Sequence, residues 1–114
     1  MPYVQITTSK KIDGSAKNTL NQKICEIMPV LPGKDKDNTL ICINDGASMF
    51  MHGKPNEGVF IAVRLFKKSP EENKKEFAQK IHAILKDVLK LPDDGCVYMN
   101  FTELENWAAN GNYM

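Results

Sequence analysis

Pro2 follows Met1 directly and precedes a run of residues that is typical of a buried strand. One interpretation is structural, because proline is tolerated at the first residue of a strand, where no ladder N–H is needed. The other interpretation is chemical. An initiator methionine before a small residue is normally removed, and Pro2 would then be an N-terminal secondary amine. Such an amine can take a proton from a substrate as a general base.

The pKa of a free Pro2 nitrogen decides whether it could act in this way. An ordinary α-amino group has a pKa of roughly 7.7–8, and the ring nitrogen of proline is somewhat more basic. Burial in an apolar pocket and a nearby lysine both disfavour the ammonium form. A downward shift of about two units would leave a largely free amine, whose direction the ring fixes because φ is locked. If Met1 stays, the nitrogen is an amide without a basic lone pair, and we expect no activity.

Tyr98 and Asn100 are polar residues two positions apart in a second strand-like run. The period of a strand puts both side chains on one face, which a shared pocket requires. Arg64 is the sole arginine and stands in the middle of an apolar run. The same period places Arg64 on the opposite face from Leu65. We therefore favour an ion pair between subunits for Arg64 over the alternative, binding of a substrate carboxylate.

The histidines and cysteines do not form a metal-binding pattern. His52 and His82 have no carboxylate, cysteine or second histidine at ligand spacing, so we expect no metal site. Cys25, Cys42 and Cys96 stand far apart and include no CxxC pair. They are typical of small buried apolar residues in a reducing compartment.

Length and charge limit the classes of function. A chain of 114 residues has room for one domain with a real core, here residues 1–114. The formal net charge is +1 and the lysines are scattered, which does not favour binding to nucleic acid. The apolar stretches are far shorter than the ~20 residues of a membrane span, and the start does not resemble a signal peptide. We expect a cytoplasmic protein that does not bind membranes.

Two halves of the chain, about 1–57 and 58–114, repeat the order strand, helix, strand. Alternating residues predict the first strand, short apolar runs predict the others, and apolar residues at helical spacing predict the helices. In the second helix, Ser69 stands at the expected N-cap, Pro70 at the first helical position and Glu72 at the capping-box position. The expected strands are Tyr3–Thr8, Leu40–Ile43, Val59–Phe66 and Cys96–Phe101.

This order predicts an α/β (α+β) fold made of two βαβ units. Right-handed crossovers would give a four-stranded, mostly parallel sheet with both helices on one face. The strands are apolar on both faces, however, and the chain has no further helix to cover the second face. We therefore expect a homo-oligomer whose sheets pack together. Trp107 and Tyr113 near the C-terminal end would be anchors at a subunit contact or a pocket rim.

Several motifs together resemble the macrophage migration inhibitory factor branch of the tautomerase superfamily. They are the Met-Pro start, the "TT" ending the first strand, Pro32–Lys34, "MFMHG" and, above all, "VYMNF" at Val97–Phe101. "LENW" at Leu104–Trp107 is similar to the matching stretch of D-dopachrome tautomerase. The resemblance implies a homotrimer in which three sheets close into a barrel covered by six helices. It also implies pockets between neighbouring subunits, around the N-terminal proline.

The resemblance further implies a cofactor-independent tautomerase, an isomerase acting on phenylpyruvate-like 2-keto acids. Pro2 would take a proton from the carbon next to the ketone and return it to give the enol, or the reverse. The carboxylate of the substrate would meet the lysine that follows "PG" in the family. That lysine is Lys34 here, although Lys36 is an alternative because "PGKDKDN" departs from the family pattern.

The remaining pocket residues come from the same resemblance. Leu65 matches the position whose backbone N–H meets the substrate carboxylate. Tyr98 would come from the neighbouring subunit as a wall, and Asn100 would orient the enol oxygen or a ring substituent. Two alternatives stay open. One is an isomerase of hydroxymuconate-type diacids, and the other is a non-catalytic trimeric binding module resembling the cytokine, with non-classical release from the cell.

Overall fold

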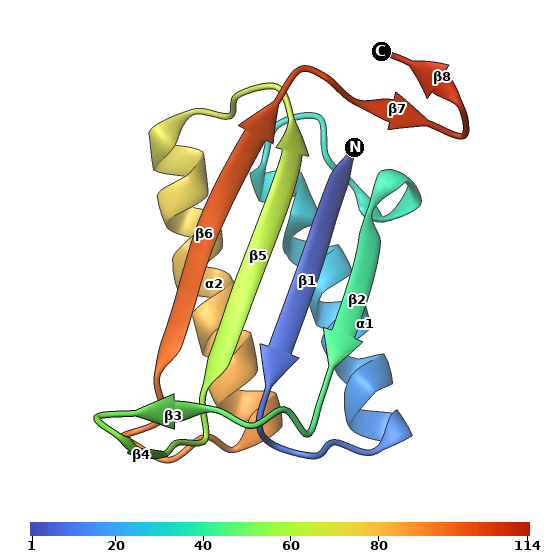
Figure 1. Cartoon of the computed structure of the whole chain (residues 1–114). Coiled ribbons are helices and arrows are strands. Elements are labelled where there is room, and N and C mark those ends of the chain that lie inside the picture. The colour runs from blue at the N-terminus through green and yellow to red at the C-terminus, as the bar shows by residue number, and fades with distance from the viewer.

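Two β–α–β units make up the computed structural model, which describes residues 1–114 (Figure 1). The first unit ends in a short strand, and two 3₁₀ turns, η1 (Met28–Val30) and η2 (Lys36–Asn38), lie between its helix and that strand. Its main elements are β1 (Pro2–Thr8), α1 (Gly14–Ile27) and β2 (Leu40–Asn44); those of the second unit are β5 (Val59–Phe66), α2 (Glu71–Leu89) and β6 (Val97–Leu104).

The four long strands form one sheet in the order β2-β1-β5-β6. Each unit pairs its own two strands in parallel, β1 with β2 and β5 with β6. The units join through β1 and β5, which run antiparallel with Pro2 opposite Leu65. The predicted fold class is confirmed: the sheet is mostly parallel, and its central pairing is the antiparallel one.

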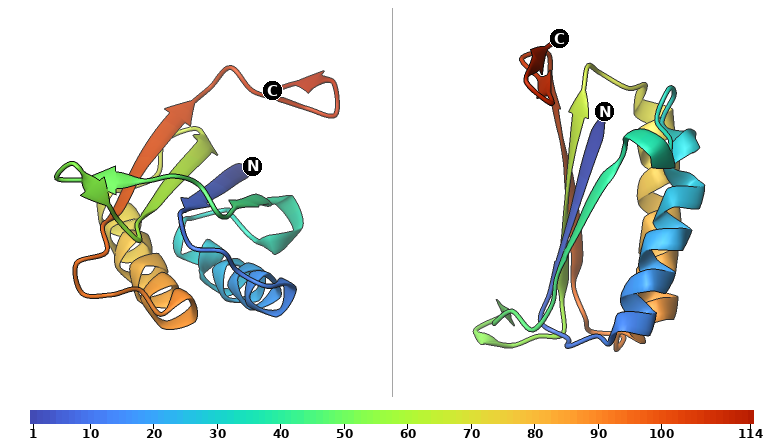
Figure 2. Two further views of the ribbon diagram at one scale, coloured as in Figure 1. Left: turned by 60° about the horizontal axis from the view of Figure 1, so that its bottom comes forward. Right: turned by 90° about the vertical axis from the view of Figure 1, so that its right-hand side faces the viewer.

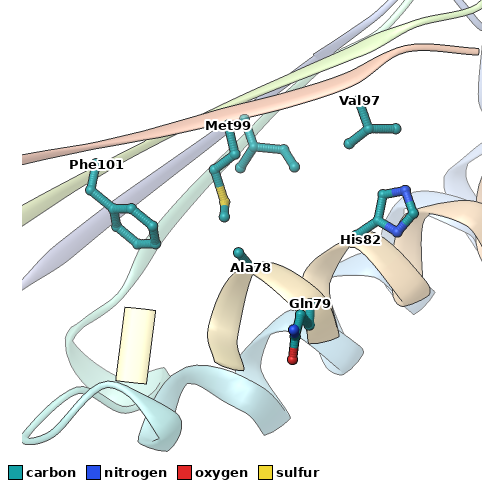
Figure 3. Close-up of a pocket in the computed structure, with 7 residues that line it drawn as sticks. Ala78, Gln79, His82, Val97, Met99 and Phe101 are labelled. Atoms are coloured by element: carbon teal, nitrogen blue, oxygen red, sulfur yellow. The ribbon is translucent and has the colours of Figure 1, made fainter. Parts of the chain in front are cut away.

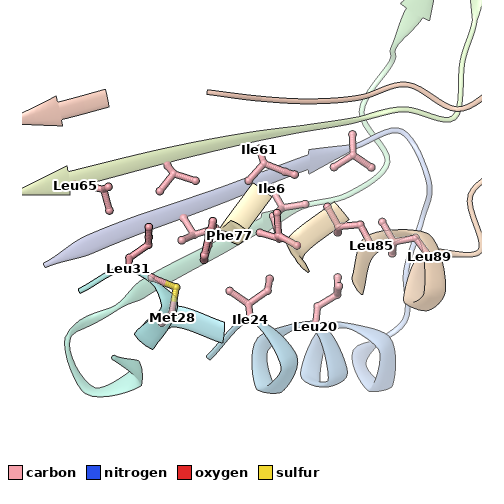
Figure 4. Packing of buried hydrophobic residues seen from close by; sticks show 14 of the residues in the cluster. Ile6, Leu20, Ile24, Met28, Leu31, Ile61, Leu65, Phe77, Leu85 and Leu89 are labelled. Carbon is pink, nitrogen blue, oxygen red and sulfur yellow. The ribbon is translucent and has the colours of Figure 1, made fainter. Parts of the chain in front are cut away.

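The hydrophobic core lies between the sheet and the two helices (Figure 4). Alternate residues of β1 and β5 are buried, as the two-residue period requires of strands with one covered face. From the helices, Leu20 and Ile24 of α1 and four residues of α2 complete the layer. The α2 residues are Phe77, Ile81, Leu85 and Leu89.

The other face of the sheet carries no helix, as the side view makes plain (Figure 2). Leu40 is 67%, Tyr98 58% and Phe60 39% exposed on this open face. Two small hairpins project on the same side of the sheet, at its two ends (Figure 2). They are β3 (Phe50–Met51) with β4 (Lys54–Pro55), and β7 (Ala108–Ala109) with β8 (Asn112–Tyr113). The uncovered face that the strand composition predicts is therefore present in the single chain.

The start of α2 differs from the prediction. The helix begins at Glu71, with Pro70 at the N-cap position and no side-chain cap. The Ser69 backbone N–H donates instead to Glu103 Oε2, at 2.6 Å. The predicted capping box of Ser69 and Glu72 is thus wrong, because a carboxylate from the distant strand β6 takes the place of a local cap.

Neither helix combines the length and apolar character that crossing a membrane requires. Both instead carry one buried stripe against the sheet, and their remaining faces are polar.

Phe77 gives a test of the core. Its side chain is fully buried and packs edge-to-face on Phe101, with 6.1 Å between ring centroids. We expect Phe77→Ala to lower the free energy of unfolding by about 3–5 kcal/mol, since truncation removes apolar contacts and leaves a cavity. Urea unfolding at one fixed protein concentration measures this. Lys80→Ala on the exposed side of α2 is the control and should change the value by less than about 0.5 kcal/mol; equal effects of the two substitutions would contradict this packing.

Candidate functional site at the N-terminal end of the sheet

The start of β1 brings together the N-terminus, a lysine and the end of β5. Pro2 is buried and lies opposite Leu65 in the sheet. Lys34, from the loop after η1, donates from Nζ to the Phe66 carbonyl at 3.2 Å. Gly33 adopts a φ of +77°, a turn that glycine makes without strain and that precedes Lys34 directly.

The electrostatics of this cluster act on the N-terminal amine. Burial lowers the pKa of the Met1 amine, and the Lys34 ammonium lowers it further, while Asp35 opposes the shift. Both burial and a neighbouring cation disfavour the charged amine. The surroundings of the N-terminus therefore favour a neutral nitrogen.

Lys34 has no carboxylate partner in the chain. It is half-buried, and the ion pairs of the protein involve Lys17, Lys74, Lys80 and Lys86 but not Lys34. Its contacts are the Phe66 carbonyl and the Met1 amine, neither of which is an anion, so its positive charge is not neutralised within the chain.

Lys36 lies elsewhere. It is exposed and begins η2, a turn whose N–H groups at Asp37 and Asn38 donate to the Asp35 carboxylate. Of the two lysines that the sequence leaves open, Lys34 is the one that acts on the N-terminal amine. Its role as a carboxylate ligand remains a prediction.

Leu65 can offer a ligand only its backbone. Its side chain is fully buried beneath the helices. This agrees with the role that the family resemblance implies, a backbone N–H beside the substrate, but nothing in the chain tests that role.

Tyr98 and Asn100 share the open face, as predicted from their spacing, but they do not lie near Pro2 in one chain. Tyr98 is in register with Phe60 and Asn100 with Ala62, whereas Pro2 is in register with Leu65. Along the sheet, Tyr98 lies five residue steps, about 17 Å, and Asn100 three steps, about 10 Å, from the level of Pro2, and β5 separates β6 from β1. Neither side chain therefore lies beside Pro2 of its own chain.

The C-terminal hairpin lies at the same end of the sheet as the N-terminus (Figure 1). Trp107 is half-buried, and its carbonyl accepts a hydrogen bond from the Met114 N–H at 2.8 Å. Tyr113 is 76% exposed. Their positions agree with a pocket rim or a subunit contact, and that role remains a prediction.

Arg64 is exposed on the open face, opposite Tyr3, and thus on the face that its parity predicts. Burial raises the pKa of the Tyr3 hydroxyl, and the Cys42 thiol beside it adds to that, whereas Arg64 acts in the other direction. No ion pair within the chain includes Arg64. An ion pair between subunits therefore stays open as a prediction.

A cleft of about 430 Å³ between α2 and the edge strand β6 is not anticipated by the sequence (Figure 3). Its lining is mainly apolar, with Gln79 and His82 of α2 at the helix side (Figure 3). None of the predicted site residues lines it. No group of three histidine, cysteine, aspartate or glutamate side chains lies together as a metal site would need.

Sequence reasoning also missed two groups close to the site. The first is the Phe66 carbonyl, which no sequence pattern marks because it is backbone. The second is Glu103, which shares the helix-facing parity of Val97 and Phe101. The sequence signal that could have identified Glu103 is a charged residue at a strand position where the neighbours of the same parity are apolar.

Replacing Lys34 tests the electrostatics of the cluster. In protein that retains Met1, we expect Lys34→Met to raise the pKa of the N-terminal amine, because a neighbouring positive charge is removed while burial remains. The rate of amine acylation as a function of pH reports this pKa. Lys36→Met is the matched control and should leave the pKa unchanged; a larger rise in the control than in Lys34→Met would show that the wrong lysine is identified.

One family model matches the chain. The family model described as macrophage migration inhibitory factor (MIF) matches residues 1–114. Among curated proteins, none matches this sequence.

Solved structures agree in fold at low sequence identity. MIF2 from Leishmania major has a TM-score of 0.89 at 17% identity, covering 100% of this chain and 97% of that one. The MIF-like protein from Entamoeba histolytica has a TM-score of 0.84 at 19% identity, with 99% and 98% covered. Native fused 4-OT has a TM-score of 0.81 at 12% identity, with 97% and 94% covered. By the family model, which matches its whole length, the chain belongs to the macrophage migration inhibitory factor family, and the solved structures show the same fold.

Proposed function

We propose that this protein is a cofactor-independent keto–enol tautomerase that uses Pro2 as a general base on phenylpyruvate-like 2-keto acids. Family membership supports an isomerase of the tautomerase kind. The observation that carries the finer proposal is the N-terminal amine beside a half-buried Lys34 that has no carboxylate partner. This arrangement combines a nitrogen biased towards its neutral form with a cation for an acidic substrate.

The reaction needs Met1 to be removed, so that the Pro2 nitrogen becomes a secondary amine. Its lone pair takes a proton from the carbon next to the ketone. The C–H electron pair forms the carbon–carbon double bond, and the carbonyl π pair moves to oxygen. The oxygen then takes up the proton, so the net change is an isomerisation without oxidant or cofactor.

The chain's own groups would divide this work. Pro2 is buried at the start of β1, where the factors that lower the pKa of the Met1 amine would also act on a freed Pro2 nitrogen. Lys34, and the backbone N–H of Leu65, would hold the substrate carboxylate. A pKa near the working pH gives a base that is both free and strong enough to remove the proton.

The second part of the proposal is a homotrimer. The open face exposes Leu40, Phe60 and Tyr98, large apolar and aromatic side chains that another copy would cover. A neighbouring copy would also supply Tyr98 and Asn100, which are offset along the sheet and separated by β5 from Pro2 of their own chain.

Turnover of phenylpyruvate tests the catalytic proposal. We expect protein whose mass spectrum shows Pro2 at the N-terminus to interconvert the enol and keto forms of phenylpyruvate. Pro2→Gly should lose about 10²-fold or more in kcat/KM, the usual contribution of a general base. Protein that retains Met1 is the matched control and should be inactive. Equal activity of all three forms would exclude Pro2 as the base.

Two other results of this assay would favour the alternatives. Faster turnover of a hydroxymuconate-type diacid than of phenylpyruvate would indicate the diacid isomerase. Absence of turnover of both, in folded protein with a free Pro2, would indicate the non-catalytic binding module.

Native mass spectrometry tests the trimer. We expect three times the chain mass, and we expect Phe60→Glu to give a monomer, because a charge on the open face cannot be buried without a partner. Gln22→Glu, on the exposed side of α1, should remain trimeric. A monomeric wild-type protein would contradict the proposed cover of the sheet.

A further inference from the structure

Glu103, near the end of β6, is tied to the start of α2 by both of its oxygens. Oε1 accepts from Lys74 Nζ at 2.8 Å, and Oε2 accepts from the Ser69 backbone N–H at 2.6 Å. The side chains of Glu103 and Lys74 are only 18% and 9% exposed. Charge-assisted hydrogen bonds of this kind are stronger than neutral ones.

These contacts hold a short loop in an unusual conformation. Residues 67–70 connect β5 to α2, and Lys67 in this loop has a φ of +67°. A non-glycine residue in this region is uncommon and persists only when its surroundings hold it. Strand β6 supplies both holding contacts: the Leu104 carbonyl accepts from the Lys67 N–H at 2.8 Å, and Glu103 binds the Ser69 N–H.

The held loop adjoins the candidate site. The carbonyl of Phe66 belongs to the peptide bond that leads into Lys67, so the backbone angles at Lys67 and Phe66 set where that oxygen points. The same oxygen accepts the hydrogen bond from Lys34 Nζ. A relaxation of Lys67 to ordinary backbone angles would turn the carbonyl and release the lysine.

We propose that Glu103 is a positioning residue for substrate binding: by holding the 67–70 loop it aims the Phe66 carbonyl, which in turn places the Lys34 ammonium beside the N-terminal proline. This inference rests on the proposed tautomerase function. Glu103 itself lies two strands away from Pro2 and touches no reacting atom.

The charges around Glu103 keep its carboxylate ionised, as its contacts with Lys74 and Ser69 require. Burial disfavours its ionised form, but the Lys74 ammonium and the Ser69 N–H outweigh burial and, with Lys68, keep the pKa of Glu103 below its usual value. Hydrogen bonds from Lys74 to Glu103 and to Glu71 raise the pKa of Lys74. The pair therefore stays charged across the neutral range, in which these contacts must hold.

The test is a double-mutant cycle on phenylpyruvate turnover with Glu103→Gln and Lys34→Met. We expect Glu103→Gln to raise KM by about tenfold with kcat within about twofold, since a carboxylate contact serves substrate and transition state alike. In the Lys34→Met background the same substitution should leave KM unchanged, because the group that it positions is gone. Glu105→Gln, nearby and exposed, is the control that should match the wild type.

The outcomes separate this inference from the proposed function. An inactive wild type would overturn both. An active wild type whose KM does not respond to Glu103→Gln would overturn the inference alone, as would an equal loss in both backgrounds, which a purely structural role predicts. If circular dichroism shows Glu103→Gln to be unfolded, Glu103→Asp replaces it, because the shorter side chain keeps the charge but cannot span both contacts; the same pattern of KM is expected.

Discussion

The antiparallel pairing of β1 with β5 is the constraint on which the candidate site depends. It sets Pro2 opposite Leu65 and so places the start of the chain at the end of β5, next to the loop that leads into α2. Register in a sheet with one buried face is strongly specified, because a shift by one residue would turn Val4 and Ile6 out of the core. The hydrophobic core therefore fixes the position of the N-terminus as firmly as it fixes the sheet.

From that pairing follows a division between the two faces of the sheet. Residues of helix-facing parity, such as Leu65 and Glu103, hold the backbone in place. Residues of the other parity, such as Arg64, Tyr98 and Asn100, stand on a face that the chain itself leaves uncovered. In the proposed trimer, a pocket assembled from Pro2 of one copy and Tyr98 of another would use residues of both parities.

Local patterns in the sequence were sufficient for the four long strands, the two helices and the fold class, but not for the two small hairpins or for the extension of β6 to Leu104. The apolar run Val59–Phe66 predicts β5 with the bounds that it has, and the helical spacing around Phe77 predicts the buried stripe of α2. The capping box at Ser69 failed because its N–H is bound by Glu103, thirty-four positions away along the chain. Local propensity carries no information about such a partner. The choice between Lys34 and Lys36 was open for the same reason, since only the turn at Gly33 and the tertiary position of Phe66 separate them.

The positive charge of Lys34 beside the N-terminal amine does not stabilise the fold, whereas it would favour binding of an anion. An ammonium and an amine lie together in a half-buried place, where like charges oppose each other. Asp35 is the adjacent residue and could have neutralised Lys34, yet its carboxylate accepts from the backbone of Asp37 and Asn38 instead. Interactions that lower the stability of the folded protein, and that no neighbouring contact compensates, are found mainly at functional sites. In the proposed reaction, the carboxylate of a substrate would supply the missing negative charge, and the cation that lowers the pKa of the N-terminal amine would also hold the substrate beside it.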